Sequence, residues 1–248
     1  MIYNFTVSPD FGPEKLPGWY IFNTWLQKAL GETVHLEVYP DFKSQREAIK
    51  AGKVDLIYAN PYDASMLVRE KGFISLAKPK SKSDEAIIAV NAARGVCSVE
   101  ELRPGITVAA TDDPDVRTMG MILLEPADLH PGNITLELCD SYVLVAKRLF
   151  NGEAEVGIFL AEAFDELSSV VKSRLRVLVQ SEIQVVHHSL MLGPALAFQR
   201  DRLRNALLEM SSSTKGCEIL RGLGFDQWEP VDQEAVEFMI DLMDTLLV

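Results

Sequence analysis

The chain has 248 residues, of which 48% are hydrophobic and 24% charged, a composition typical of a globular protein with one large domain or two smaller ones. It contains 24 Lys and Arg against 36 Asp and Glu, so the formal net charge is −12. This charge argues against long-range attraction to nucleic acid or anionic lipid, and no stretch approaches the roughly 18 apolar residues of a membrane span. We therefore expect neither nucleic-acid binding nor membrane insertion.

The N-terminal residues and the cysteines carry information on the cellular compartment of the protein. Met1 leads directly into the apolar residues Ile2, Phe5 and Val7, without the basic and small-residue features of a secretory signal. The sequence as written predicts a cytoplasmic protein, and a periplasmic one if it is a mature form. The 3 cysteines lie far apart and fit neither a disulfide framework nor a metal-binding pair. We expect no metal and no cofactor.

Strand-like and helical segments alternate from the N-terminus, a pattern that favours a mainly parallel sheet covered on both faces. The first helix shows the clearest periodicity, because Trp19, Phe22 and Leu26 recur at helical spacing. The elements predicted in this first set are strands at 3–8, 34–39, 54–58 and 74–77 and helices at 16–30, 43–51 and 62–72.

A polar stretch over residues 78–83 separates this set from a second one. The second set has predicted strands at 85–90, 106–110, 134–138, 156–159 and 176–179 and helices at 116–124 and 141–150. A strand at 183–188 is expected to return the chain to the first set. From Leu203 onward the sequence is helical and ends on an apolar-faced helix at 234–247.

The strand at 54–58 ends in the most distinctive local pattern of the chain. Asn60 is a good N-cap, and Pro61 suits a first helical turn because its missing N–H would be unpaired there anyway. Gly72 is placed to end the helix. Such a junction leaves backbone N–H groups at the carboxyl end of a strand, where open α/β sheets bind small ligands.

Four segments together point to a family. They are Gly52–Pro61, Ser98–Ala109, Val145–Gly157 and Glu218–Phe225. In this order they resemble motifs of the phosphate/phosphonate-type solute-binding proteins that serve ABC transporters. The resemblance implies an α/β fold of the type 2 periplasmic-binding-protein-like clamshell kind, each lobe being a mixed, mainly parallel sheet flanked by helices. A single doubly wound domain is the rival architecture.

The layout predicts a discontinuous first lobe, residues 1–84 and 186–248, and a second lobe, residues 85–185. Two crossings of the chain would form the hinge, and a small polar ligand, phosphonate-like, phosphate-like or another small anion, would bind in the cleft between the lobes. The resemblance further implies an ABC permease as a partner, or a sensor kinase if the protein serves in sensing.

The ligand-binding motifs of this family match less well than its fold motifs. Where the family has a Ser-Thr-Ser-Gly run at a helix N-terminus, this chain has Val116–Met119, and only Thr118 retains a hydroxyl. The family's Ser-His pair falls on Ser141 and Tyr142. Three acidic residues, Asp112, Asp113 and Asp115, lie at this helix start, where carboxylates act as caps but oppose a dianion.

Residues that follow predicted strands are the candidate ligand contacts. Arg117 could bind an anion bidentately, and an aromatic wall of Phe11, Phe42, Tyr58 and Tyr62 would suit an organic group. The full set of candidates is Ser8, Asp10, Phe11, Phe42, Tyr58, Asn60, Tyr62, Thr111, Asp112, Arg117, Thr118, Ser141, Tyr142 and Glu162.

No catalytic residue is predicted. Neither a metal-binding His pair at helical spacing nor a nucleophile motif is present. His187 and His188 are adjacent on the predicted return strand, so only one of them can face a cleft. The alternatives to a solute-binding protein are a cytosolic enzyme on the same clamshell, such as those of the futalosine route to menaquinone, and a sensory subunit.

Overall fold

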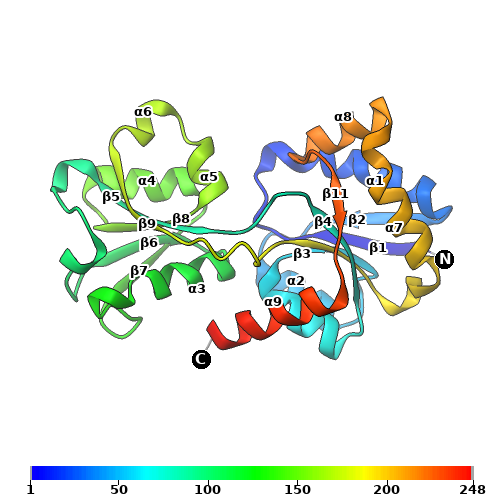
Figure 1. Ribbon diagram of the computed structural model, residues 1–248, viewed down its shortest axis with the longest axis horizontal. Coiled ribbons are helices and arrows are strands. Elements are labelled where there is room, and N and C mark those ends of the chain that lie inside the picture. Colours follow the sequence, from blue (N-terminus) through cyan, green and yellow to red (C-terminus); the bar gives the residue numbers. More distant parts are fainter. Residues whose placement is uncertain (1, 247–248) are drawn as a thin grey trace. The chain divides into compact units, whose positions relative to one another are not determined.

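The computed structural model describes residues 2–246, which divide into two compact units, each built around its own sheet (Figure 1). Unit 1 contains the chain up to Lys82 and His187–Asp244, and unit 2 is built on Ser83–Val186. Up to Asp244, the chain therefore leaves unit 1 once and returns to it once. No helix within residues 2–246 has the length and apolar character needed to cross a bilayer.

The sheet of unit 1 has six strands in the order β11-β4-β10-β3-β1-β2. Strand β1 pairs in parallel with β2 and β3, whereas β10 runs antiparallel to β3 and β4. The bounds of the strands are Ile2–Val7 for β1, Thr33–Glu37 for β2, Leu56–Ala59 for β3, Ile74–Pro79 for β4, Ser189–Leu192 for β10 and Trp228–Pro230 for β11.

Helices cover both faces of this sheet. Helix α1 (Leu16–Leu30) buries Trp19, Phe22 and Leu26 against it and ends at Gly31, whose φ of 71° is in the left-handed region that glycine tolerates best. Figure 1 shows α1, α7 and α8 on one side of the sheet and α2 and α9 on the other. These helices span Phe42–Lys50 (α2), Arg200–Leu208 (α7), Thr214–Leu223 (α8) and Gln233–Leu246 (α9).

The sheet of unit 2 has five strands in the order β7-β6-β8-β5-β9. Strand β6 pairs in parallel with β7 and β8, and β5 runs antiparallel to β8 and β9. The strands are β5 (Ala86–Asn91), β6 (Thr107–Thr111), β7 (Thr135–Cys139), β8 (Val156–Leu160) and β9 (Leu175–Gln180). The helices are α3 (Pro114–Leu123), α4 (Tyr142–Asn151), α5 (Ala161–Glu166) and α6 (Ser169–Lys172).

The two sheets share one arrangement of five strands. Strands β2, β1, β3, β10 and β4 of unit 1 correspond in order and direction to β7, β6, β8, β5 and β9 of unit 2. In each unit the antiparallel fourth strand is the one the chain forms on arriving from the other unit. The predicted α/β fold with two lobes is confirmed, and the single doubly wound domain is excluded.

Two local predictions are wrong. Residues 183–188 do not form a strand, because the Glu85 carboxylate accepts the backbone N–H groups of Ile183 and Gln184 and takes these donors away from any ladder. The returning strand is β10 instead. The segment after Asn60 is a 3-10 turn (Pro61–Asp63) followed by a π-helical turn (Met66–Glu70) rather than an α-helix.

The predicted N-cap at this junction is confirmed. The Asn60 side-chain oxygen accepts the backbone N–H of Tyr62 at 2.9 Å, and Pro61 occupies the first position of the turn. Gly72 ends the segment with a φ of 70°.

Candidate functional site

In unit 1 the ends of three neighbouring strands bring four polar side chains together. The carboxyl ends of β1 and β3 meet the amino end of the antiparallel β10 at one edge of the sheet. The Ser8 hydroxyl accepts the Asn60 backbone N–H at 2.8 Å, and the Asn60 side-chain amide donates to Asp10 at 2.8 Å. Asp10 also lies 2.8 Å from Nε2 of His188. We call Ser8, Asp10, Asn60 and His188 the unit 1 cluster.

The charge of this cluster is balanced internally. Burial alone raises the pKa of Asp10, but the facing His188 and the hydrogen bonds from His188 and Asn60 outweigh it, so the pKa lies below its usual value. The same contact favours the protonated imidazole of His188. The Tyr58 ring is stacked on His188 with centroids 5.3 Å apart. The position of His188 is thus set by Asp10 and Tyr58, both of which sequence reasoning had placed at strand ends.

The neighbouring His187 has a different environment. It is only 4% exposed, and its ring contacts the Ser189 hydroxyl at 3.2 Å. Burial, assisted by the positive charge of Lys78, lowers the pKa of His187 to about 4. His187 is therefore a neutral, structural residue at neutral pH.

The four predicted aromatic residues of unit 1 form two groups. Phe11 and Tyr58 both pack on Trp19, with centroids 6.4 and 4.9 Å away. Phe42 and Tyr62 instead flank the guanidinium of Arg46, which lies 5.3 and 4.6 Å from their ring centroids. Arg46 in turn pairs with Asp63 at 2.5 Å.

In unit 2, the end of β6 lies beside the start of α4. The Tyr142 hydroxyl donates to the Asp113 carboxylate at 3.1 Å and also bonds with Thr111. Burial raises the pKa of Tyr142 well above its usual value, and the charges of Asp113 and Asp115 add to the shift. The phenol therefore stays protonated and serves as a donor. Asp113 stands at the N-cap position of α3 but makes no side-chain cap bond.

The remaining candidates of unit 2 have structural partners. The Thr118 hydroxyl donates to the Pro114 carbonyl at 2.8 Å, and Ser141 caps α4 by accepting the Leu144 N–H at 3.3 Å. Arg117 lies 3.8 Å from Asp112, and these side chains are 32% and 61% exposed. Glu162 lies in the first turn of α5. Asp112 and Arg117 are thus the exposed charged pair at this edge.

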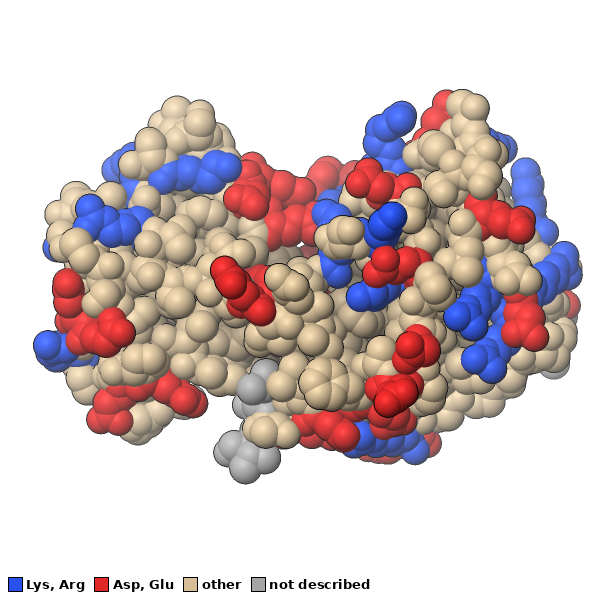
Figure 2. All heavy atoms as spheres, viewed as in Figure 1, with Lys and Arg blue, Asp and Glu red and all other residues tan. Residues whose placement is uncertain are grey.

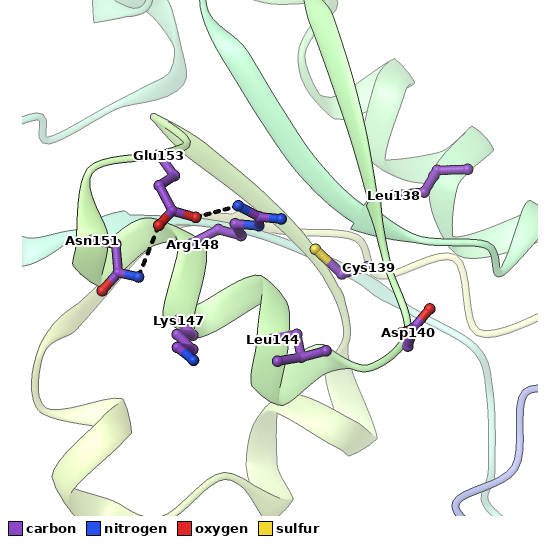
Figure 3. Close-up of a pocket in the computed structure, with 8 residues that line it drawn as sticks. All are labelled: Leu138, Cys139, Asp140, Leu144, Lys147, Arg148, Asn151 and Glu153. Carbon is purple, nitrogen blue, oxygen red and sulfur yellow. Dashed lines mark hydrogen bonds and ion pairs between the residues drawn. The ribbon is translucent and has the colours of Figure 1, made fainter.

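A separate pocket of about 310 Å³ opens on unit 2 between β7 and α4 (Figure 3). Of its two cationic lining residues, Arg148 is already paired with Glu153, which also accepts from the Asn151 amide at 2.9 Å. The other lining residues are Leu138, Cys139, Asp140, Leu144 and Lys147. None of the predicted ligand contacts lines this pocket. Figure 2 shows basic and acidic side chains interspersed on the visible faces of both units, without a continuous basic surface.

Sequence reasoning missed two residues of these edges. His188 is joined to Asp10 although 178 positions separate them in the sequence, and only the antiparallel placement of β10 reveals the contact. Arg46 lies one turn into α2 and not at a strand end, so it was not among the candidates. Side chains alternate along a strand, so only one of His187 and His188 can face the predicted cleft. This was the one sequence signal that pointed to His188.

Comparison with known proteins places these features in context. Residues 5–236 match a family model described as "ABC transporter, phosphonate, periplasmic substrate-binding protein". A search of curated protein sequences gave no significant match.

Solved structures share the fold at low sequence identity. PhnD1 from Prochlorococcus marinus in complex with methylphosphonate has a TM-score of 0.84 and 13% identity over 99% of this chain and 98% of that one. A binding protein component of an ABC phosphonate transporter from Pseudomonas aeruginosa has a TM-score of 0.75 and 15% identity, covering 98% and 87%. The periplasmic aliphatic sulphonate binding protein SsuA from Escherichia coli has a TM-score of 0.67 and 12% identity, covering 99% and 86%.

Proposed function

The chain belongs to the periplasmic substrate-binding proteins of phosphonate ABC transporters, and on this premise we propose that it captures a small, singly charged anion of the sulfonate or protonated phosphonate kind. The observation that carries the proposal is the unit 1 cluster. It places an imidazole whose protonated form is favoured by Asp10 at the ends of strands where α/β sheets bind ligands.

The ligand class follows from the charges at the strand ends of unit 2. Asp113 and Asp115 are 4% and 0% exposed at the start of α3. A like charge about 4 Å from a carboxylate costs about 4 kcal/mol at an effective dielectric constant of about 20. A second negative charge on the ligand would roughly double this cost. A monoanion is therefore favoured over a dianion.

The proposed contacts are the strand-end residues of each unit. In unit 1 these are the unit 1 cluster and the ring of Tyr58, which offers an apolar face to an organic group. In unit 2 they are Thr111, Tyr142 and Arg117, the last as a bidentate partner for anionic oxygens. Phe42 is buried, and Thr118 and Ser141 already have backbone partners, so these three support the local structure.

The family supports a proposal for the partner and the compartment. Its members are periplasmic components that hand a small molecule to an ABC permease, and we propose the same partner and compartment for this chain. We also propose that it acts by binding and not by catalysis, because its family is one of transporter components.

The test is calorimetry and thermal shift with anions that differ in charge. Methanesulfonate and sulfate present the same sulfur–oxygen groups with one and two charges. We expect methanesulfonate to bind at least tenfold more tightly than sulfate, with methylphosphonate binding more tightly as the pH is lowered. A ligand at 100 times its dissociation constant should stabilise the protein by about 2.7 kcal/mol. Equal or tighter binding of sulfate would contradict the charge argument, and no response to any small anion would contradict the function.

A further inference from the structure

The chain returns from unit 2 to unit 1 through residues 181–188, which form neither helix nor strand. One side chain of unit 2 holds the first half of this segment. Glu85, immediately before β5, accepts the Ser181 hydroxyl, the Ile183 backbone N–H at 3.0 Å and the Gln184 backbone N–H at 2.6 Å. A single carboxylate thus replaces the strand ladder that the segment lacks.

The hydrogen bonds to Glu85 are buried from solvent. Glu85 is 7% exposed and Ser181 is 6% exposed. A buried carboxylate is tolerated when strong donors surround it, and hydrogen bonds to a charged group are among the strongest in proteins. Gln184 has a φ of 59°, a left-handed conformation unusual for a residue with a side chain. The bond from its N–H to Glu85 offsets that strain.

The segment is anchored at its other end as well. His188 contacts Asp10 within unit 1, whereas the Val186 carbonyl accepts the N–H of Asp84, another residue of unit 2, at 2.8 Å. The outgoing connection is tied in the same way, since the Lys80 N–H donates to the Gln227 carbonyl at 2.9 Å within unit 1. Between the two carboxylate anchors, residues 185–187 of the returning segment, all in the described part of the chain, are hydrogen-bonded to neither Glu85 nor Asp10, although the His187 ring contacts Ser189 within unit 1.

We infer that Glu85 is a positioning residue that fixes residues 181–184 to unit 2 and confines bending of the returning connection to residues 185–187. A connection of three residues has fewer accessible conformations than one of seven, so less conformational entropy is lost when the protein adopts one arrangement around a ligand. Only this consequence for ligand capture rests on the proposed function. The hydrogen bonds that hold residues 181–184 on Glu85, which we call the clamp, are a property of the ligand-free protein.

Hydrogen exchange tests the clamp directly. In Glu85→Gln one carboxylate oxygen becomes an NH₂ group, which cannot accept. Because Ile183 and Gln184 donate to different oxygens of Glu85, we expect exchange of at least one of these two amides to become at least tenfold faster, equivalent to about 1.4 kcal/mol. Glu182→Gln is the matched control, because Glu182 is an exposed glutamate of the same segment, and it should leave both rates unchanged. Unchanged rates in Glu85→Gln would overturn the inference.

A distance measurement tests the consequence for bending without any ligand. Spin labels would be placed at Cys97, which is exposed in unit 2, and at Lys28→Cys on α1, with Cys139→Ala and Cys217→Ala in the background. The distance distribution should broaden in Glu85→Gln and not in Glu182→Gln. An equally narrow distribution in both variants would refute the positioning role even if exchange at residues 183 and 184 accelerates.

Adding methanesulfonate separates this inference from the proposed function. If methanesulfonate binds the parent protein, Glu85→Gln should weaken binding about tenfold although Glu85 is not among the proposed contacts. If methanesulfonate does not bind, the proposed function fails while the exchange and distance results still decide the role of Glu85.

Discussion

The two units have the same five-strand arrangement, yet equivalent positions carry different side-chain environments. Val34 and Leu36 of β2 pair with β1 as Leu136 and Leu138 of β7 pair with β6. The first two are 3% and 5% exposed and belong to the unit 1 core with Trp19, Phe22 and Leu26 of α1, whereas the second two are 40% and 54% exposed. A shared topology therefore fixes where a residue lies in the sheet but not whether it is buried.

The strand ends of the two units also differ, in the charge of the group that faces their carboxylate. In unit 1, Asp10 faces the imidazole of His188, so the carboxylate is matched by a cation. In unit 2, Asp113 faces the phenol of Tyr142, which donates a hydrogen bond but no charge. The corresponding edges of the two sheets thus differ in charge balance, because the carboxylate of unit 1 faces an imidazole and that of unit 2 faces an uncharged donor. The ligand class in our proposal depends on that contrast.

The largest expected effect on stability tests the difference in burial between Leu36 of β2 and Leu138 of β7. Leu36→Ala removes a buried side chain and should lower the free energy of unfolding by about 2–4 kcal/mol. Leu138→Ala, at the register-equivalent position, should change it by less than about 0.5 kcal/mol. Urea denaturation of both variants measures the difference, and similar losses would mean that β7 is covered in solution.

A second prediction uses the two adjacent histidines of unit 1. The pKa of His187 is about 4 in the folded protein and about 6.5 when unfolded, so the unfolded state binds more protons between these values. Stability should fall by about 3 kcal/mol as the pH drops from above 6.5 to below 4. This part of the pH dependence should be missing from the pH profile of His187→Gln and remain in that of His35→Gln, whose side chain is exposed. A pH profile that is the same in both variants would show that His187 is not buried as described.

A third prediction tests the hydrogen bond between Tyr142 and Asp113 at the strand ends of unit 2. Tyr142→Phe removes the donor to Asp113 and should cost about 1–2 kcal/mol of unfolding free energy. Tyr3→Phe is the control, since Tyr3 is a buried tyrosine of unit 1 whose hydroxyl has no hydrogen-bond partner among the described residues. Equal costs would show that the bond to Asp113 contributes nothing specific.

The smallest expected effect on stability comes from the exposed ion pair of unit 2. Arg117→Ala should change the unfolding free energy by less than about 1 kcal/mol, because partly exposed pairs contribute little. It should nevertheless weaken methanesulfonate binding about tenfold if Arg117 contacts the anion. Arg94→Ala removes a similar surface pair, with Glu155 at 3.5 Å, and should leave binding unchanged. Unaltered affinity in Arg117→Ala would remove Arg117 from the proposed contacts.

Most of the architecture was predictable because it depends on periodicity and caps. The spacing of Trp19, Phe22 and Leu26 defines α1, and Asn60 with Pro61 marks the junction after β3. The short β11 was missed, because its 3 residues carry no periodic signal. The return strand was placed too early because the donors of Ile183 and Gln184 go to a carboxylate almost 100 residues away in the sequence.

The candidate site was less predictable than the fold. Strand-end logic brought Ser8, Asp10 and Asn60 together correctly, since parallel neighbours end at the same edge. It could not identify His188, whose contact with Asp10 depends on the antiparallel β10. It also could not tell that the hydroxyl of Thr118 is used within its own helix, because sequence alone does not show where a donor points.

The most direct test of the account is the affinity of methanesulfonate for the parent protein, His188→Gln and His35→Gln, measured by calorimetry at neutral pH. The account predicts saturable binding to the parent, at least tenfold weaker binding to His188→Gln and unchanged binding to His35→Gln. Binding to His188→Gln as tight as to the parent would contradict the claim that the unit 1 cluster holds the anion.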